Sequence, residues 1–190
     1  MSKIIQPGAG VLYMKVGTHA QEDLSDIIAR KQKEIADVGY AMWGYGGSTC
    51  YPTSMVQPFA RSFADRGRAI HLVMHKMNSR HRAEQVRAER FSVDGSHWQT
   101  IPQGINVLGS RYALVIRNLR EYEDELNLAA TRVGVGRNQG RLGSRYIQGQ
   151  ADKACLEVVE EENSNETVKK ISIELAAELI DPYAVFLSER

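Results

Sequence analysis

Apolar and polar positions alternate with a period of two over much of the chain, the pattern of strands that bury one face. Residues 69–77 show it most clearly, because every second residue from Ile70 to Met74 is a large aliphatic one. Shorter apolar runs predict further strands at residues 11–16, 40–45, 111–116, 126–135 and 155–159. Residues 171–179 also alternate, but Ala-Ala-Glu-Leu at 176–179 suits a helix as well, so strand and helix both stay open there.

Residues 20–38 repeat apolar side chains at helical spacing and predict a first helix. Thr18 and Gln21 fit a capping box at its start, in which a hydroxyl and a side-chain amide satisfy free backbone amides. Gly39 follows the last apolar residue of the pattern and predicts a left-handed end of this helix.

A second helix is predicted over residues 55–65, because Met55, Phe59 and Phe63 would share one face. Ser54 and Gln57 offer it another capping box. Proline lacks a backbone N–H, so Pro58 fits this helix only in the first turn.

Several segments predict turns. Asp94-Gly95 lies between apolar arms and is typical of a hairpin turn. Residues 78–90 are polar and suit either a surface loop or a short exposed helix. Residues 121–125 are charged and predict a loop after the strand at 111–116. Residues 160–167 form an acidic turn, and Asp181-Pro182 is expected to break the chain.

The predicted elements indicate a single α+β domain over residues 1–190. Strands outnumber helices by about three to one, and both helices come early in the chain. This order predicts a mostly antiparallel curved sheet or partial β-barrel with two N-terminal helices packed on one side. It loosely resembles the small barrel domains that bind RNA or modified bases, but no motif is long enough to transfer residue roles.

Composition narrows the class of protein. The hydrophobic fraction of 43% and charged fraction of 25% are those of an ordinary globular chain, so a core of normal size is expected. No apolar run is long enough to span a membrane, and the first residues lack the regions of a signal peptide. Cys50 and Cys155 lie far apart, which excludes a disulfide framework. We therefore expect a soluble cytoplasmic protein without a membrane partner.

Charge is distributed unevenly. Residues 61–90 hold eight Lys or Arg and three acids, whereas residues 151–190 hold ten acids and four Lys or Arg. The middle of the chain could therefore present a positive surface to an anion or to nucleic acid, although a solvated mixture of charges is an equally simple interpretation.

Gly39 to Ala60 is the most unusual stretch, since glycines, aromatic rings and hydroxyls interleave there with almost no charge. Its ligand-binding candidates are Trp43, Tyr45, Gly46, Gly47, Ser48, Thr49 and Tyr51. Backbone amides and hydroxyls could hold a phosphate while aromatic rings stack on a base. The pattern is neither a Walker loop nor GxGxxG. The structural alternative is a tight turn with an aromatic plug.

A second Gly-rich stretch covers residues 134–149 and carries Arg137, Arg141 and Arg145 without an acid. Guanidinium groups among glycines suit a loop that binds phosphates or nucleic acid. The alternative is a solvated basic loop. If the two Gly-rich stretches meet, a nucleotide is the natural ligand for the pocket between them.

Cys50 is a weak candidate nucleophile, with His71 or His75 as its base. A metal shared by these histidines is not expected, because residues four apart on a strand lie about 13 Å apart. Cys155 is expected to be a core residue, and paired carboxylates for acid–base catalysis are not evident.

The leading hypothesis is a non-catalytic domain that binds a nucleotide-like or other phosphorylated ligand between the two stretches, without a cofactor or metal. Three alternatives stay open. The first is binding of RNA or single-stranded DNA through the basic surface at residues 61–90. The second is a Cys50-dependent hydrolase or transferase, and the third is a structural protein that forms homo-oligomers.

Overall fold

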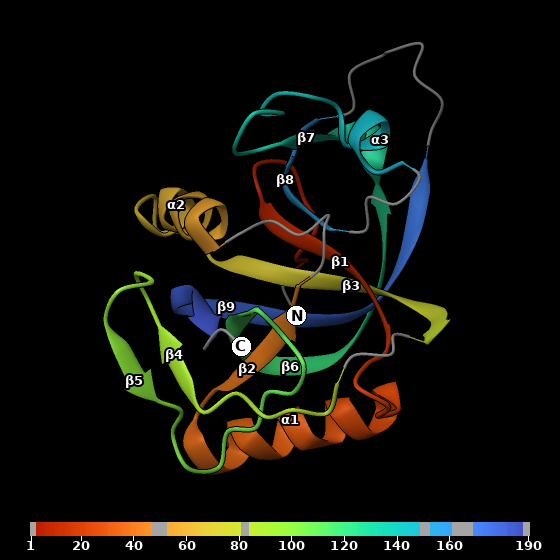
Figure 1. The fold of residues 1–190 in the computed structure, drawn as a ribbon. Coiled ribbons are helices and arrows are strands. Elements are labelled where there is room, and N and C mark those ends of the chain that lie inside the picture. Colours follow the sequence, from red (N-terminus) through yellow and green to blue (C-terminus); the bar gives the residue numbers. More distant parts are fainter. Residues whose placement is uncertain (1–2, 47–52, 81–83, 149–152, 161–168, 188–190) are drawn as a thin grey trace.

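The computed structural model describes residues 3–46, 53–80, 84–148, 153–160 and 169–187 (Figure 1). Its strands are β1 (Gly10–Thr18), β2 (Ala41–Tyr45), β3 (Ile70–Arg80), β4 (Arg90–Ser92), β5 (Trp98–Thr100), β6 (Tyr112–Asn127), β7 (Thr131–Val133), β8 (Lys153–Val158) and β9 (Lys170–Leu187). Its helices are α1 (Leu24–Val38), α2 (Thr53–Ala64) and α3 (Gly143–Tyr146), and a 3₁₀ turn, η1, covers Leu128–Ala130. The chain therefore has a mixed α+β fold, as the sequence predicts.

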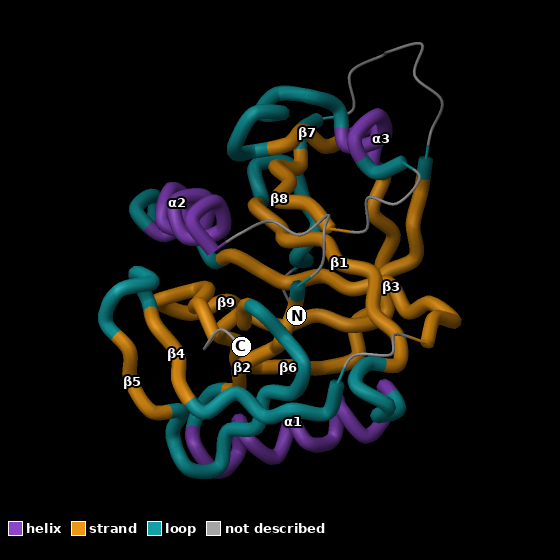
Figure 2. Tube along the Cα trace, in the orientation of Figure 1, coloured by secondary structure: helices purple, strands orange, loops and turns teal. Residues whose placement is uncertain are grey.

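One sheet holds these strands in the order β2-β6-β9-β3-β1-β8-β7, and the β4–β5 hairpin attaches to β9. Only β1 and β3 pair in parallel; the other strand pairs in the described ranges are antiparallel. Figure 2 shows the strands filling the centre of the molecule, with helices and loops around them. The sheet is open, and the partial barrel stays a prediction.

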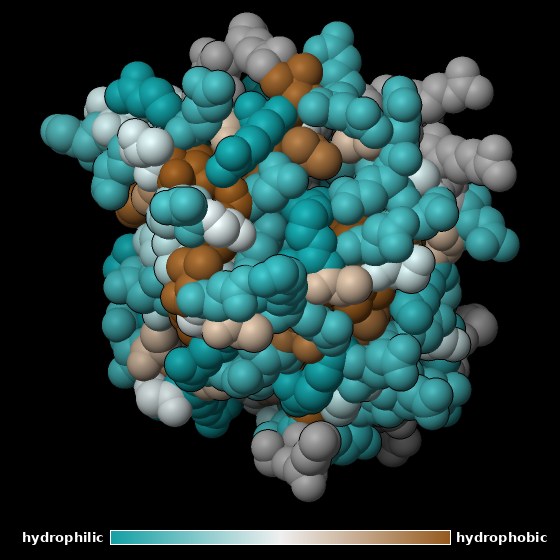
Figure 3. Space-filling view, turned by 90° about the horizontal axis from the view of Figure 1, so that it is seen from below, coloured by the Kyte–Doolittle hydropathy of each residue, from teal (hydrophilic) through white to brown (hydrophobic). Residues whose placement is uncertain are grey.

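The two longer helices pack against different strands. α1 lies against β1, β2 and β6, whereas α2 lies against β3 and β9. Seen from below, the molecule exposes mainly hydrophilic side chains, with hydrophobic ones in small separate groups (Figure 3). Packing of both helices on one side of the sheet is not tested by these contacts and stays a prediction.

α1 begins later than the capping-box pattern predicts. Thr18 is the last residue of β1 and pairs with Arg80 of β3, so it cannot cap a helix. Ala20 and Gln21 have positive φ angles of 49° and 61°, which are not helical. The predicted end is confirmed, because Gly39 has φ 97° and its N–H donates to the Ile35 carbonyl.

α2 covers two residues more than predicted at its start, so its predicted capping box is also wrong. Ser54 is the second helical residue, and the Gln57 amide reaches across to two other segments instead of the helix start. Pro58 is the sixth residue and lies beyond the first turn. It leaves the Ser54 carbonyl without its helical donor, and Ser54 is exposed, so water can satisfy that carbonyl.

β6 and β9 are longer than the sequence predicts. Residues 121–125 continue β6, since Glu121 pairs with Leu175 and Asp124 with Ile173. Residues 171–179 are therefore strand and not helix. The predicted strand over 126–135 is confirmed only at 126–127 and 131–133, because the Asn127 side chain accepts from the Ala129 N–H and starts η1 between β6 and β7.

The expected break at Asp181-Pro182 is also wrong, because β9 continues to Leu187. On either side of it, Leu179 pairs with Ile116 and Ala184 with Leu114, so the intervening residues bulge out of the β6 ladder. A bulge accommodates proline because it needs no ladder hydrogen bond there. β9 can therefore pair with β3 and β6 before the bulge and with β4 and β6 after it.

The core has two hydrophobic clusters. The larger one lies around β1, β3, β8 and the first part of β9, and it includes Phe59 and Phe63 of α2. The smaller one joins Met42, Val115 and Val185 to the segment 101–107. No helix within the described ranges is long and apolar enough to cross a membrane.

Candidate functional site

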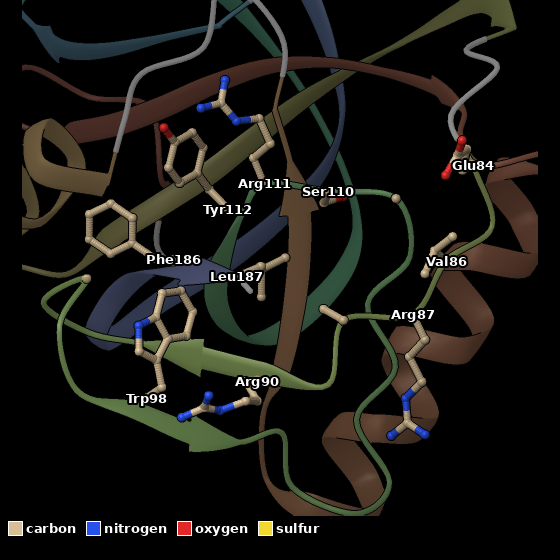
Figure 4. A pocket seen from close by; sticks show the side chains of 13 residues that line it. Glu84, Val86, Arg87, Arg90, Trp98, Ser110, Arg111, Tyr112, Phe186 and Leu187 are labelled. Carbon is tan, nitrogen blue, oxygen red and sulfur yellow. The ribbon is translucent and has the colours of Figure 1, made fainter. Parts of the chain in front are cut away.

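A pocket of about 970 Å³ opens over the smaller hydrophobic cluster, where the β4–β5 hairpin faces the start of β6 and the end of β9 (Figure 4). The residues that line it are Glu84, Val86, Arg87, Ala88, Arg90, Gly95, Trp98, Gly109, Ser110, Arg111, Tyr112, Phe186 and Leu187. Three of them are arginines, three carry large aromatic rings, and one is acidic. We call it the Arg/aromatic pocket.

The rings of Tyr112 and Phe186 line one wall of the pocket, and the ring of Tyr45 lies behind them. Tyr45 of β2 pairs with Tyr112 of β6, and Tyr112 pairs with Phe186 of β9. Residues opposite each other in a sheet point to the same face, so the rings meet. Their centroids lie 5.4 Å apart for Tyr45 and Tyr112 and 5.9 Å apart for Tyr112 and Phe186. Tyr45 is buried, while the other two are half-buried.

Two arginines lie against aromatic faces in this pocket. The Arg90 guanidinium lies 6.0 Å from the Trp98 ring centroid, and that of Arg111 lies 5.5 Å from the Tyr112 centroid. Both arginine side chains are exposed, and neither forms an ion pair with any residue that the structure describes. Arg87 differs, because it donates to the Ile105 carbonyl at 3.0 Å.

The β4–β5 turn holds Trp98 in place. The predicted hairpin is confirmed, but its loop spans residues 93–97 and is longer than a two-residue turn. Asp94 Oδ1 accepts from the Ser96 and His97 N–H groups, both at 2.8 Å. These bonds, the His97 ones first, hold the pKa of Asp94 well below its usual range. The side chain of Asp94 thus stabilises the turn in which it lies.

Ser110 and His19 form the one contact here that suggests nucleophilic chemistry, with the hydroxyl 3.3 Å from Nε2. The same hydroxyl donates to the Leu108 carbonyl at 3.0 Å, and His19 Nε2 lies 3.0 Å from that carbonyl. A hydroxyl that donates to a carbonyl directs no proton at the imidazole, so this arrangement does not activate Ser110. It fastens residues 108–110 to the turn before α1.

The described part of the first Gly-rich stretch lies beside the pocket. Trp43 and Tyr45 are core residues of β2, 5% and 4% exposed. A Cβ at Gly44 would clash with Ser110, and one at Gly46 would lie 3.5 Å from the Arg111 N. The candidates Gly47, Ser48, Thr49, Cys50 and Tyr51 lie outside the described residues. This stretch therefore supports the pocket wall from behind.

The second Gly-rich stretch packs elsewhere, against α2. A Cβ at Gly134 would clash with the Phe59 ring, and one at Gly136 with the Met55 side chain. The candidates Arg137, Arg141 and Arg145 are exposed and do not line the pocket. The structure thus brings this stretch to the first turns of α2, which form the end of the first stretch, but the Arg/aromatic pocket does not lie between the two stretches.

The catalytic alternatives gain no support from the described residues. Burial raises the pKa of the Cys155 thiol, and Cys155 is a core residue as predicted. His75 Nδ1 lies 2.8 Å from the Ser172 carbonyl, and burial lowers the pKa of His71. Cys50 is not described, so its pairing with either histidine stays untested. Within the described ranges no three His, Cys, Asp or Glu side chains are grouped to hold a metal.

The sequence analysis named none of the residues that line this pocket as ligand-binding candidates, although Arg87 and Arg90 fall within the basic range 61–90 that it offered as an alternative surface for nucleic acid. The other sequence signal is an arginine next to an aromatic residue at 111–112, which is too common to indicate a site. Comparisons of the chain with known protein families, curated proteins and solved structures find no match. Its function is therefore inferred from the site itself.

Proposed function

We propose that this protein binds, without catalysis, a nucleotide-like or similar ligand that combines an aromatic ring with a phosphate, and that the Arg/aromatic pocket is the site. One observation carries the proposal: Arg90 and Arg111 lie beside aromatic faces and have no acidic partner among the described residues. Unpaired guanidinium groups favour anions, and exposed ring faces favour flat rings.

The ring of the ligand would stack near Trp98 and Phe186, which both line the pocket (Figure 4). Both side chains are half-buried, so part of each stays accessible to a ligand. Stacking of a base on an aromatic side chain contributes about 1–3 kcal/mol.

The phosphate would lie toward Arg111, whose planar guanidinium can donate two parallel hydrogen bonds to it. Glu84 is the single acid of the lining against Arg87, Arg90 and Arg111, so the pocket carries a net positive charge. The backbone at Gly46 lies directly behind Arg111 and supports it.

This proposal moves the ligand from between the two Gly-rich stretches to the Arg/aromatic pocket. Stacking on Trp43 is dropped, because this ring belongs to the hydrophobic core. Trp98 takes that role, and Tyr45 now supports Tyr112. A Cys50-dependent reaction, a homo-oligomer and a cytoplasmic location stay predictions from the sequence.

Calorimetric titration with the four common nucleoside monophosphates tests the proposal. We expect at least one to bind, and Arg111→Ala to weaken that binding roughly tenfold to hundredfold, since a hydrogen bond to a charged group contributes about 1.5–3 kcal/mol. Arg66→Ala is the matched control, because Arg66 packs on Phe63 of α2, outside the pocket. No binding of any nucleotide, or equal affinity in Arg111→Ala, contradicts the proposal.

A further inference from the structure

Figure 1 shows the β4–β5 hairpin, which carries part of the Arg/aromatic pocket, on one side of α2 and the loop after β7 on the other. On one flank, Gln57 donates to the Val93 carbonyl at 2.9 Å and to the Ala184 carbonyl at 2.6 Å. These carbonyls lie two residues from Gly95 and Phe186, which line the pocket. The first turns of α2 are therefore hydrogen-bonded to the two segments that carry these lining residues.

On the other flank, Met55 and Phe59 contact Gly136 and Gly134. A Cβ at Gly134 would clash with the Phe59 ring, and Gly136 has a positive φ of 81°, which favours glycine. The loop after β7 is thereby pressed against the helix. One helix, about 10–12 Å across with its side chains, separates this loop from the pocket.

The loop presents a positive surface of its own. Arg137 and Arg141 are exposed and form no ion pair with residues in the described ranges. The sequence has no acid between Thr131 and Gln148. This loop therefore matches the pocket in having guanidinium groups that the fold leaves available to an anion.

Two acids near α2 are already engaged. Asp181 lies 3.5 Å from Arg61, and the carboxylate of Asp94 accepts hydrogen bonds within its own turn. The surface between pocket and loop thus offers few free negative charges to repel a polyanion.

The rest of the basic surface expected from the sequence at residues 61–90, outside the pocket that holds Arg87 and Arg90, is a weaker candidate for the same role. Arg61 pairs with Asp181, and Arg66 packs over the Phe63 ring. Arg68 donates to the Gly8 carbonyl at 2.6 Å. These three arginines are engaged by the fold, which leaves the pocket and the loop as the better pair.

We propose that the ligand is a single-stranded nucleic acid, with one or two bases in the Arg/aromatic pocket and a backbone that crosses α2 to Arg137 and Arg141. The inference rests on the proposed function, because it places a nucleotide in the pocket. A single nucleotide does not reach both flanks of a helix, whereas a strand of several nucleotides does. Proteins that bind single-stranded nucleic acids combine aromatic side chains, which stack on the bases, with a positively charged surface that follows the phosphates.

Fluorescence anisotropy with oligonucleotides of one to about twelve nucleotides tests the inference. We expect affinity to rise with length until the strand spans α2 and then to level off, with a weaker affinity for duplex of the same sequence. Arg137→Ala/Arg141→Ala should leave mononucleotide binding unchanged but weaken the oligonucleotides. Oligonucleotide binding by this variant should also depend less on salt. The slope of log Kd against log salt should decrease by about 0.7 for each phosphate contact that is lost.

Arg66→Ala again serves as the matched control, because it removes an exposed arginine in the turn after α2, away from both surfaces. Affinity that is independent of length, equal affinity for duplex, or oligonucleotide binding unchanged in Arg137→Ala/Arg141→Ala overturns the inference and leaves the mononucleotide pocket standing. If neither mononucleotides nor oligonucleotides bind the wild-type protein, the proposed function itself fails.

Discussion

Two charged regions of this protein use their arginines in opposite ways. Beneath α1, Arg30 donates to Glu22, Glu34 and the Asn106 carbonyl, so its charge is fully partnered. In the Arg/aromatic pocket, Arg90 and Arg111 meet only ring faces among the described residues. We call the first region, formed by Glu22, Arg30, Lys31, Glu34 and Asn106, the α1 network.

The α1 network serves the fold. Lys31 is buried and donates to Glu34 at 3.1 Å and to the Asn106 carbonyl at 2.6 Å. Glu34 in turn accepts from the Asn106 N–H at 3.0 Å. These bonds fix the segment 101–107, which covers the smaller core, to α1. The difference suggests that charges partnered within the chain hold its segments in position, and that unpartnered, exposed ones are available to a ligand.

The largest change in stability is expected when the α1 network loses Glu34, the acid that binds the buried Lys31. Glu34→Ala leaves the ammonium of Lys31, whose side chain is only 3% exposed, without its carboxylate. Removing one partner of a buried ion pair costs about 3–5 kcal/mol, which urea unfolding measures. Lys33→Ala, which breaks an exposed pair with Asp37, is the control and should cost less than about 1 kcal/mol. Equal losses in the two variants would contradict a structural role of the α1 network.

A smaller effect should appear with pH. Burial, which outweighs the attraction of Glu34, lowers the pKa of Lys31 from 10.5 to about 8. Between these values the unfolded chain holds a proton that the folded chain has released, so the contribution of Lys31 to stability rises with pH. Below the folded pKa the charged lysine costs up to roughly 3 kcal/mol.

Urea unfolding of the wild type and of Lys31→Met at about pH 7 and about pH 10 measures this contribution. We expect the gain in stability with pH to be smaller in the variant. The same pH dependence in both proteins would show that Lys31 does not titrate in this window.

Much of the fold was readable in the sequence because it follows from local patterns. The alternation at residues 69–77 and the glycine at 39 reflect one strand and one helix end, and both predictions are confirmed. The start of α1 was misread because pairing of Thr18 with Arg80 outweighs the capping pattern. β9 passes through Asp181-Pro182 because a bulge against β6 accommodates the proline.

The candidate site was harder to predict, because it depends on pairing between distant strands. Tyr45, Tyr112 and Phe186 are neighbours only through the register of β2, β6 and β9. Arg90 and Arg111 become distinctive only in the structure, which shows that neither forms an ion pair with a described residue. The sequence did mark Gly46, whose backbone lies close to Arg111 in the pocket wall.

Within the pocket, Trp98→Ala should weaken nucleotide binding by about 1–3 kcal/mol, because it removes a stacking surface. Titration with the nucleoside monophosphate that binds best measures this loss. Trp98→Phe keeps a ring and should retain most of the affinity. A loss as large in Trp98→Phe as in Trp98→Ala would argue against stacking.

The smallest effect is expected from the turn that positions Trp98. Asp94→Ala removes the acceptor of the Ser96 and His97 N–H groups. We expect a modest loss of nucleotide affinity, smaller than in Trp98→Ala, and a small decrease in Tm. His97→Ala, which keeps Asp94 and both N–H groups, should bind nearly as well as the wild type. A larger loss of nucleotide affinity in His97→Ala than in Asp94→Ala would contradict a role of Asp94 in stabilising the turn.

The most direct test of the central claim compares binding and stability in Arg90→Ala/Arg111→Ala. If these arginines are available for a ligand and not needed by the fold, the double variant should lose nucleotide binding. Its free energy of unfolding should stay within about 1 kcal/mol of the wild type, since each change is an exposed substitution. A double variant that still binds nucleotide, or that unfolds as readily as Glu34→Ala, would contradict the claim.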